Sequence, residues 1–305
     1  MTEPTADAGQ GPAETVGFVG LGRMGLPMSR HVAAAGFRVQ AWNRSPRQDD
    51  LPVSGHWTAV ASPADAARGA SVLITVLPDL VDVEQVCAGD DGLLAGAAEG
   101  TVLVVMGTVS PPALRAWAEQ VAGLGLRVVD APVSGGDVGA VEGTLSVMVG
   151  GDPADVARVQ PVLEAMASRV THLGPLGSGQ WAKACNQVVV ATTLAALGEA
   201  VTLARHGGLD VAQVLDVLAG GLAGSRALEI KRELLVEQDY RPGGSAAFQH
   251  KDLGFALMAA RDSGVALPVT ALVDQLFGAL RWTGLGGEDH SAVVRVIQAL
   301  SGDGG

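Results

Sequence analysis

The sequence of 305 residues predicts a two-part fold, an α/β half with a doubly wound parallel sheet followed by an all-helical half. Two observations lead to this prediction. Between Thr15 and Leu173, short apolar runs typical of buried strands alternate with helical patterns, as in a parallel sheet covered by helices on both faces. Beyond Gly177 no segment is typical of a strand, and helical patterns follow one another to the end of the chain.

The α/β half begins with a strand–turn–helix pattern that predicts a dinucleotide site. Val16–Val19 is expected to be a buried strand, Met24–Ala35 a helix and Phe37–Trp42 the second strand. Glycines in G-x-G-x-x-G spacing would form a tight turn, admit a pyrophosphate and pack helix against strand, with the helix N-terminus facing the phosphates. The expected cofactor contacts in this Rossmann-type turn are Gly20, Leu21, Gly22, Arg23, Met24 and Gly25. The alternative is a glycine-rich turn that holds no ligand.

The residues after the second strand indicate which dinucleotide is bound. An acid at this place would accept a hydrogen bond from the ribose 2′-hydroxyl of NAD, but the chain carries Asn43 and Arg44 and has no acid before Asp49. A guanidinium can hold a 2′-phosphate through charge-assisted hydrogen bonds, each contributing about 1.5–3 kcal/mol. We therefore predict NADP(H) in preference to NAD(H). The alternative is an Arg44 that is simply solvated.

Ligand-binding groups are also expected where later strands end. Leu77-Pro78 and Gly107-Thr108 follow apolar runs at the edge where a parallel sheet receives its ligands. Ser134, Gly135 and Gly136 offer a hydroxyl and backbone N–H groups suited to a carboxylate, although the same residues are equally typical of a tight turn. The remaining strands are expected at Val72–Leu77, Thr101–Met106, Arg127–Asp130, Leu145–Val149 and Arg169–Leu173, with helices at Pro111–Leu124 and Pro153–Met166.

Composition excludes several classes of protein. A net charge of −12 argues against a general nucleic-acid surface. The two cysteines have no metal or redox spacing, so we expect no metal and a reducing, cytoplasmic setting. The apolar run Val188–Leu197 is too short for a membrane span. Residues 1–14 lack the pattern of a signal peptide, and both they and residues 302–305 are expected to be disordered tails.

The all-helical half is expected to begin after the break Gly174-Pro-Leu-Gly177, which divides the chain into domains 15–174 and 175–301. Its first helix, Ser178–His206, has no charged residue between Lys183 and Glu199, so most of its sides must be buried. We therefore expect a homodimer with the helical domains packed together. Further helices are expected at Asp210–Leu218, Ser225–Val236, Gln249–Ser263, Pro268–Thr283 and Asp289–Leu300.

Lys183 is the strongest candidate for proton transfer. The chain has 20 lysines and arginines, but only Lys183, Lys231 and Lys251 are lysines, and lysine can release its proton at accessible pH whereas arginine cannot. Asn186 and Gln187 lie three and four residues further along and share its helix face. The alternative is a lysine that extends from an apolar surface to water.

Four motifs resemble the β-hydroxyacid dehydrogenase family, the relatives of 3-hydroxyisobutyrate dehydrogenase and tartronate semialdehyde reductase. They are Gly20–Met28, Asp130–Gly136, the pattern Gly177-x-Gly-x-x-x-Lys183-x-x-Asn186, and Lys251-Asp-Leu253. The resemblance implies an enzyme that transfers hydride between NADP(H) and a small carboxylate-bearing hydroxyacid or semialdehyde. By position it implies Lys183 as the catalytic acid and base, Ser134, Gly135, Gly136, Asn186 and Gln187 as substrate contacts, and Asn43, Arg44, Leu77, Pro78, Thr108 and Lys251 as cofactor contacts in addition to the glycine turn.

Three positions depart from the family pattern, and two other functions stay open. Val105 and Gly107 stand where many relatives have an acid and a serine, and Gln187 resembles the tartronate semialdehyde reductases where others have a second asparagine. Imine reductases resemble this chain but generally carry Asp or Tyr in place of Lys183, and a non-catalytic assembly module would tend to lose the lysine. For a dehydrogenase or an imine reductase, three features are expected to meet at one cleft. They are the glycine turn (Gly20–Gly25), the Ser134 turn (Ser134–Gly136) and Lys183.

Overall fold

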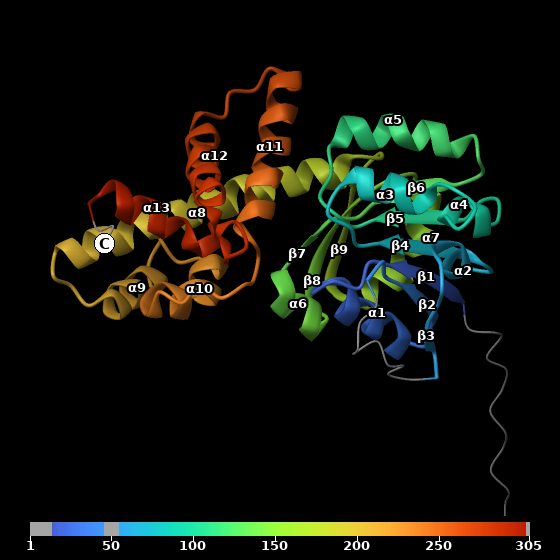
Figure 1. Cartoon of the computed structure of the whole chain (residues 1–305), viewed down its shortest axis with the longest axis horizontal. Coiled ribbons are helices and arrows are strands. Elements are labelled where there is room, and N and C mark those ends of the chain that lie inside the picture. The colour runs from blue at the N-terminus through green and yellow to red at the C-terminus, as the bar shows by residue number, and fades with distance from the viewer. Residues whose placement is uncertain (1–13, 46–54, 303–305) are drawn as a thin grey trace, which may run out of the picture. The chain divides into compact units, whose positions relative to one another are not determined.

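The structure, a computed structural model, describes residues 14–45 and 55–302, and these form two compact units (Figure 1). The first unit contains the described residues up to Gly107 together with Leu114–Leu176. The second contains Thr108–Ala113 together with the described residues from Gly177 onward. The predicted disordered tails lie, apart from Glu14 and Gly302, outside the described residues.

The first unit is built on a single mixed sheet. Among the described residues the strands follow the order β3-β2-β1-β4-β5-β6-β8-β7, and β9 pairs with β8. Pairing is parallel from β3 to β6, which confirms the predicted doubly wound α/β fold. The strands are β1 (Thr15–Val19), β2 (Arg38–Trp42), β3 (Trp57–Ala59), β4 (Val72–Thr75), β5 (Val102–Val105), β6 (Arg127–Asp130), β7 (Val133–Ser134), β8 (Leu145–Gly150) and β9 (Ala167–Gly174).

One part of the sheet differs from the wholly parallel arrangement that the sequence predicts. β8 runs antiparallel to both β6 and β7 and is parallel only to β9. Gly135 and Gly136 follow β7 with φ angles of 130° and 63°, which glycine adopts readily because it has no Cβ. The helix α6 (Gly136–Glu142) then leads into β8, which pairs antiparallel with β7, so the second half of the sheet is mixed.

Helices flank the sheet on both sides, with α5 above it and α1 below it in the view of Figure 1. The sheet interior explains why its strands are apolar runs without alternation, since every residue of β4 and β5 is buried. Ser62 caps the helix that follows it, because its side chain accepts a hydrogen bond from the Asp65 N–H at 3.1 Å. The helices before Gly177 are α1 (Gly25–Ala34), α2 (Pro63–Ala67), α3 (Leu80–Cys87), α4 (Leu93–Gly96), α5 (Pro111–Ala122), α6 (Gly136–Glu142) and α7 (Pro153–Glu164).

The second unit is helical and is organised around its first helix, α8, which spans Ser178–His206 as predicted. Leu194, Leu197 and Val201 of α8 belong to the core of this unit, and α9 to α13 pack against or near it. The other elements are α9 (Val211–Ala219), α10 (Arg226–Glu237), α11 (Ala246–Ser263), α12 (Pro268–Leu280), the π-helical turn η1 (Arg281–Leu285), the 3-10 turn η2 (His290–Ala292) and α13 (Val293–Leu300).

The apolar segment around Val188–Leu197 is longer than the sequence analysis expects. It belongs to α8, whose 29 residues make it the one described helix that is long and apolar enough to cross a membrane by length and composition alone. The core helix of a globular unit passes the same test, and half of its most apolar window is buried inside the structure.

A buried ion pair fixes the middle of the helical unit. Lys231 on α10 donates from Nζ to Oδ2 of Asp289 at 2.7 Å, and Oδ1 of Asp289 accepts from both the N–H and the hydroxyl of Ser291. Burial acts to raise the pKa of Asp289, but His290, Lys231 and Ser291 outweigh it and the pKa is lowered. The second of the three lysines therefore has a structural place in the helical core.

Candidate active site

The glycine turn of the first unit has the backbone geometry that its spacing predicts. Gly20 has a φ of 96°, and a Cβ there would lie 2.4 Å from the Val76 carbonyl oxygen. A Cβ on Gly25 would lie 1.8 Å from the Gly20 oxygen, so the start of α1 is pressed against the turn. A Cβ on Gly22 would meet nothing within 4 Å, which leaves open space beside the exposed backbone. This turn fits a dinucleotide pyrophosphate, because two glycines shape it and the third leaves room.

The side chain of Asn43 holds the glycine turn against the end of β2. Its Oδ1 accepts a hydrogen bond from the Leu21 N–H at 2.9 Å, and its Nδ2 donates to the Ser45 carbonyl at 2.8 Å. Arg44 follows directly, and its side chain is exposed. Asn43 therefore shapes the turn through its own hydrogen bonds, and among the described residues that follow β2 the exposed guanidinium is that of Arg44.

The Ser134 turn, which is predicted to bind a carboxylate, lies beside the glycine turn within the first unit. Gly135 and Gly136 are exposed at the junction of β7 and α6, and Ser134 is half-buried. Arg23 in the glycine turn forms an ion pair with Asp137, the first residue after Gly136, with Nη2 and Oδ2 2.7 Å apart. The two turns that the sequence predicts to bind ligands in this unit are thus neighbours.

Two departures from the family pattern have a structural reason at the ends of β4 and β5. A Cβ on Gly107 would lie 2.0 Å from the Leu77 carbonyl oxygen, so a serine there would require the backbone to move. Val105 is fully buried and stands in register with Asp130 on β6, which is itself fully buried. An acid at position 105 would place two buried carboxylates on adjacent strands, which a valine avoids.

The predicted cofactor contacts are divided between the two units. Leu77 and Pro78 belong to the first unit, whereas Thr108 and Lys251 belong to the second. Lys251 on α11 donates from Nζ to the Thr108 carbonyl at 2.7 Å, and the Val109 N–H donates to Oε1 of the buried Gln180 on α8 at 3.0 Å. The segment that starts at Thr108 is therefore fastened to the helical unit from both α8 and α11.

Lys183 lies in the second turn of α8, where its side chain is partly buried. Burial lowers the pKa of its ammonium below the ordinary value of 10.5, the Asp252 carboxylate acts in the opposite direction, and Lys251 lowers the pKa further. Lys183 thus has the features of a proton-transfer group, a partly dry environment and nearby charges of both signs.

The two amides on the same face of α8 have different surroundings. Asn186 is partly buried, and its Oδ1 is buried without a hydrogen-bond partner among the described residues. Gln187 is buried, and its Nε2 donates to Oδ2 of Asp252 at 2.7 Å. The unpaired buried amide oxygen of Asn186 can accept a hydrogen bond from a donor group on a ligand, whereas the amide N–H of Gln187 already donates to a carboxylate.

Asp252 is the residue of this region that sequence reasoning missed. It lies within the motif Lys251-Asp-Leu253, but the motif alone assigns it no role. Only 6% of its surface is exposed, and it meets Gln187 from a distance of 65 residues along the chain. The available signal was an acid next to a lysine in a mostly apolar helix, which does not reveal the partner on α8.

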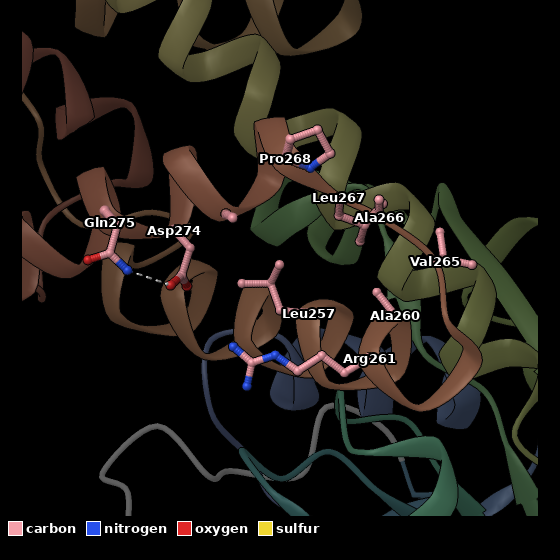
Figure 2. Close-up of a pocket in the computed structure, with 10 residues that line it drawn as sticks. Leu257, Ala260, Arg261, Val265, Ala266, Leu267, Pro268, Asp274 and Gln275 are labelled. Atoms are coloured by element: carbon pink, nitrogen blue, oxygen red, sulfur yellow. Dashed lines mark hydrogen bonds between the residues drawn. The ribbon is translucent and has the colours of Figure 1, made fainter.

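A surface pocket of the helical unit lies between α11 and α12 (Figure 2). Leu257 and Arg261 line it from α11, and Pro268 and Asp274 line it from α12. None of the residues predicted to bind substrate or cofactor is part of its lining. The pocket is therefore separate from the candidate active site.

Family models match both units of the chain. Residues 15–174 match the NAD-binding domain of 6-phosphogluconate dehydrogenase. Residues 177–297 match the model described as the NAD-binding region of NADP-dependent 3-hydroxyisobutyrate dehydrogenase. The motifs named above fall within these two ranges.

Individual relatives are similar along almost the whole length. The chain is 37% identical to 2-hydroxy-3-oxopropionate reductase of Escherichia coli, over 94% of this chain and 98% of that protein. It is 36% identical to 2-(hydroxymethyl)glutarate dehydrogenase of Eubacterium barkeri, over 94% and 96% of the respective chains. Among solved structures, 3-hydroxyisobutyrate dehydrogenase of Mycobacterium tuberculosis with L-serine is similar with a TM-score of 0.82 and 32% identity, over 94% of this chain and 100% of the other.

These matches confirm the resemblance seen in the four motifs, since they cover both units and their identities exceed 30%. The chain belongs to the β-hydroxyacid dehydrogenase family and is a nicotinamide-dependent oxidoreductase that acts on CH–OH groups.

Proposed function

We propose that the protein transfers hydride between NADP(H) and a small β-hydroxyacid or its semialdehyde, with Lys183 as general acid and base. The observation that carries this proposal is the environment of Lys183. Its ammonium is partly buried, its pKa is lowered by burial, and Asn186 offers an unpaired buried oxygen on the same helix face. This combination provides proton transfer and a polar contact for a substrate hydroxyl.

The chemistry follows from the residues present. The bound cofactor supplies hydride to the carbonyl carbon of the substrate. As the C=O bond opens, Lys183 gives its proton to the oxygen, and in the oxidative direction the neutral amine takes the proton from the hydroxyl. Asn186 orients the oxygen, and Ser134 with the backbone N–H groups of Gly135 and Gly136 holds the substrate carboxylate.

Preference for NADP(H) is proposed from the end of β2. The exposed guanidinium of Arg44 is next to Asn43, which fixes the glycine turn, and the sequence has no acid between the end of β2 and Asp49 to bind a ribose 2′-hydroxyl. The match of residues 177–297 to a model described as NADP-dependent also supports this choice. Thr108 and Lys251 are proposed to stay near the nicotinamide end, where Lys251 fastens the Thr108 carbonyl.

The substrate class is proposed from the relatives. The reductase and the dehydrogenase named above act, by their names, on 2-hydroxy-3-oxopropionate and 2-(hydroxymethyl)glutarate. Each is a small molecule with at least one carboxylate and a hydroxymethyl or carbonyl carbon. We propose a substrate of this kind, a cytoplasmic setting, and a homodimer formed through the helical unit.

Replacing Lys183 tests the catalytic role. Lys183→Ala is expected to lower turnover about a hundred- to ten-thousandfold, because general acid catalysis is lost, while NADPH still binds. Lys183→Arg is expected to lose activity too, since arginine keeps the charge but does not release a proton. The measurement is NADPH oxidation with short semialdehydes, together with NADPH affinity by fluorescence.

The control is Cys185→Ser, an exposed position two residues further along α8 that is expected to keep full turnover. Near-full turnover of Lys183→Ala would remove Lys183 from the role. Oxidation of NADPH with cyclic imines but with no semialdehyde would identify an imine reductase. Activity with neither class would favour a non-catalytic module.

A further inference from the structure

A buried carboxylate on α11 contacts Lys251, which is expected to meet the cofactor, and Gln187, which is expected to meet the substrate. Asp252 on α11 accepts a hydrogen bond from Nε2 of Gln187 on Oδ2 at 2.7 Å, and Oδ1 lies 3.2 Å from Nζ of Lys251. Asp252 is 6% exposed and Gln187 is 9% exposed. A buried carboxylate is stable only with such partners, so this group of three is a built feature of the fold.

Further hydrogen bonds hold this group in place. Nε2 of Gln249 lies 3.5 Å from the Gln187 carbonyl oxygen, and Oε1 of Gln249 lies 3.1 Å from Nδ1 of His290. Lys251 also donates to the Thr108 carbonyl and lies 4.8 Å above the ring of Phe255. The carboxylate is therefore held from α8 and from its own helix, and Gln249 joins this helix to η2.

Asp252 meets α8 on the helix face that also carries Lys183. Gln187 lies four residues after Lys183 on α8, so the two side chains share a face. The negative charge of Asp252 favours the ammonium form of Lys183, whereas burial and Lys251 oppose it. Charges act strongly on each other where water is excluded, so this balance depends on the carboxylate keeping its position.

We propose that Asp252, held between Gln187 and Lys251, is a positioning residue that keeps Lys183 aligned and charged for proton donation to the substrate. This inference rests on the proposed function, because it assumes that Lys183 carries the proton. It adds a residue that none of the motif-based roles includes.

This proposal explains why position 187 carries glutamine and not the shorter asparagine. Its amide reaches Asp252 at 2.7 Å across the contact between α8 and α11, and asparagine is shorter by one methylene group. An asparagine at position 187 would leave the buried carboxylate without its α8 partner unless α8 and α11 moved closer together. The departure from a second asparagine is thus explained as a requirement of the Asp252 contact.

Elements packed against α8 carry three further charged pairs. His250 on α11 faces Asp274 on α12 with Nε2 and Oδ1 3.5 Å apart, and Lys231 on α10 binds Asp289. Arg295 on α13 lies 3.3 Å from Glu288. The groups that act on the charge of Lys183 are Asp252 and Lys251.

The test is the pH profile of reductive turnover at saturating NADPH. Reduction needs the protonated lysine, so turnover is lost as pH rises through the pKa of Lys183. Asp252→Asn removes the charge that raises this pKa, so turnover is expected to be lost at lower pH than in the wild type. Lys251→Gln removes the charge that lowers it, and the loss is expected at higher pH.

Two variants serve as controls. Asp274→Asn removes another mostly buried carboxylate of the same unit and is expected to leave the profile unchanged. Asp252→Glu keeps the charge and is expected to give a pH profile close to that of the wild type. For every variant, NADPH affinity and the melting temperature show whether the fold and the cofactor site are intact.

The outcomes separate the two proposals. If Lys183→Ala is inactive but Asp252→Asn has the wild-type profile, the role of Asp252 is overturned and the proposed function stands. If Lys183→Ala keeps its turnover, the proposed function itself fails. Should Asp252→Asn not fold, Lys251→Gln decides, since an unchanged profile in that variant overturns the inference and a shift to higher pH supports it.

Discussion

Single residues in the first unit show how much of a ligand-binding turn is visible in local sequence. The spacing of Gly20, Gly22 and Gly25 predicts the turn, and the close approaches at Gly20 and Gly25 agree with it. The hydrogen bond from the Leu21 N–H to Asn43 joins residues 22 positions apart, and spacing alone does not reveal it. Asn43 was expected to touch the cofactor, and the structure shows in addition that it shapes the turn.

At this scale, Arg44 is predicted to set cofactor preference. Arg44→Ala is expected to lower the ratio of NADPH to NADH specificity about ten- to a hundredfold, because charge-assisted hydrogen bonds to the 2′-phosphate are lost. The measurement is kcat/KM with each cofactor at constant ionic strength. Arg38→Ala, an exposed arginine at the other end of β2, is the control and should change neither value. An unchanged ratio in Arg44→Ala would refute the NADP(H) assignment.

Whole elements were predictable when they were long and uniform. Helix α8 has the predicted limits, because no proline interrupts its helical pattern between Gly177 and Gly207. Short elements were missed, among them β7 with two residues and α4 with four. Their few residues carry too little periodicity to stand out, and their conformation depends on neighbouring strands and on glycines with positive φ. The predicted helix Pro268–Thr283 similarly ends at Leu280, where the π-helical turn η1 begins.

The buried pair that joins α10 to η2 leads to a prediction about stability. Lys231→Met leaves Asp289, which is fully buried, without its cation, and is expected to lower the free energy of unfolding by about 3–5 kcal/mol. Urea unfolding at neutral pH measures the loss. Arg226→Met breaks the exposed pair with Glu229 and is expected to cost at most about 1 kcal/mol.

The same pair predicts the direction of a pH effect. The pKa of Asp289 is lower in the folded chain than its ordinary value of 3.8, so its contribution is complete above that value and is lost as pH falls through the lowered pKa. The stability difference between wild type and Lys231→Met should therefore shrink in acid. If Lys231→Met and Arg226→Met lowered the free energy of unfolding equally at neutral pH, the buried pair would contribute no more to stability than the exposed one.

The whole molecule contains contacts that no local pattern predicts. Sequence motifs identified the glycine turn, the Ser134 turn and Lys183 separately, whereas the contact of Asp252 with Gln187 and that of Lys251 with Thr108 span 65 and 143 residues. Such contacts depend on how the helices of the second unit pack. The family was visible from its motifs, but the polar group around Asp252 required the folded chain.

The proposed homodimer is a prediction at this scale. The helical unit exposes large apolar side chains, including Leu203 at 75%, Leu222 at 109% and Trp282 at 72%. Such side chains favour burial against a second copy. Light scattering after size exclusion should give twice the chain mass of 30.8 kDa, at all concentrations used for assays. A mass of one chain that does not change with concentration would contradict the dimer.

The segment Thr108–Ala113 means that the polypeptide passes from one unit to the other three times. A fragment that starts at Gly177 would lack the backbone segment whose Val109 N–H and Thr108 carbonyl form hydrogen bonds with Gln180 and Lys251. Cutting the gene at the glycine-rich break would therefore not yield a self-sufficient helical half. Designs that exchange this half between relatives must transplant two separate pieces, or they will leave a buried glutamine and a lysine without their intended donor and acceptor.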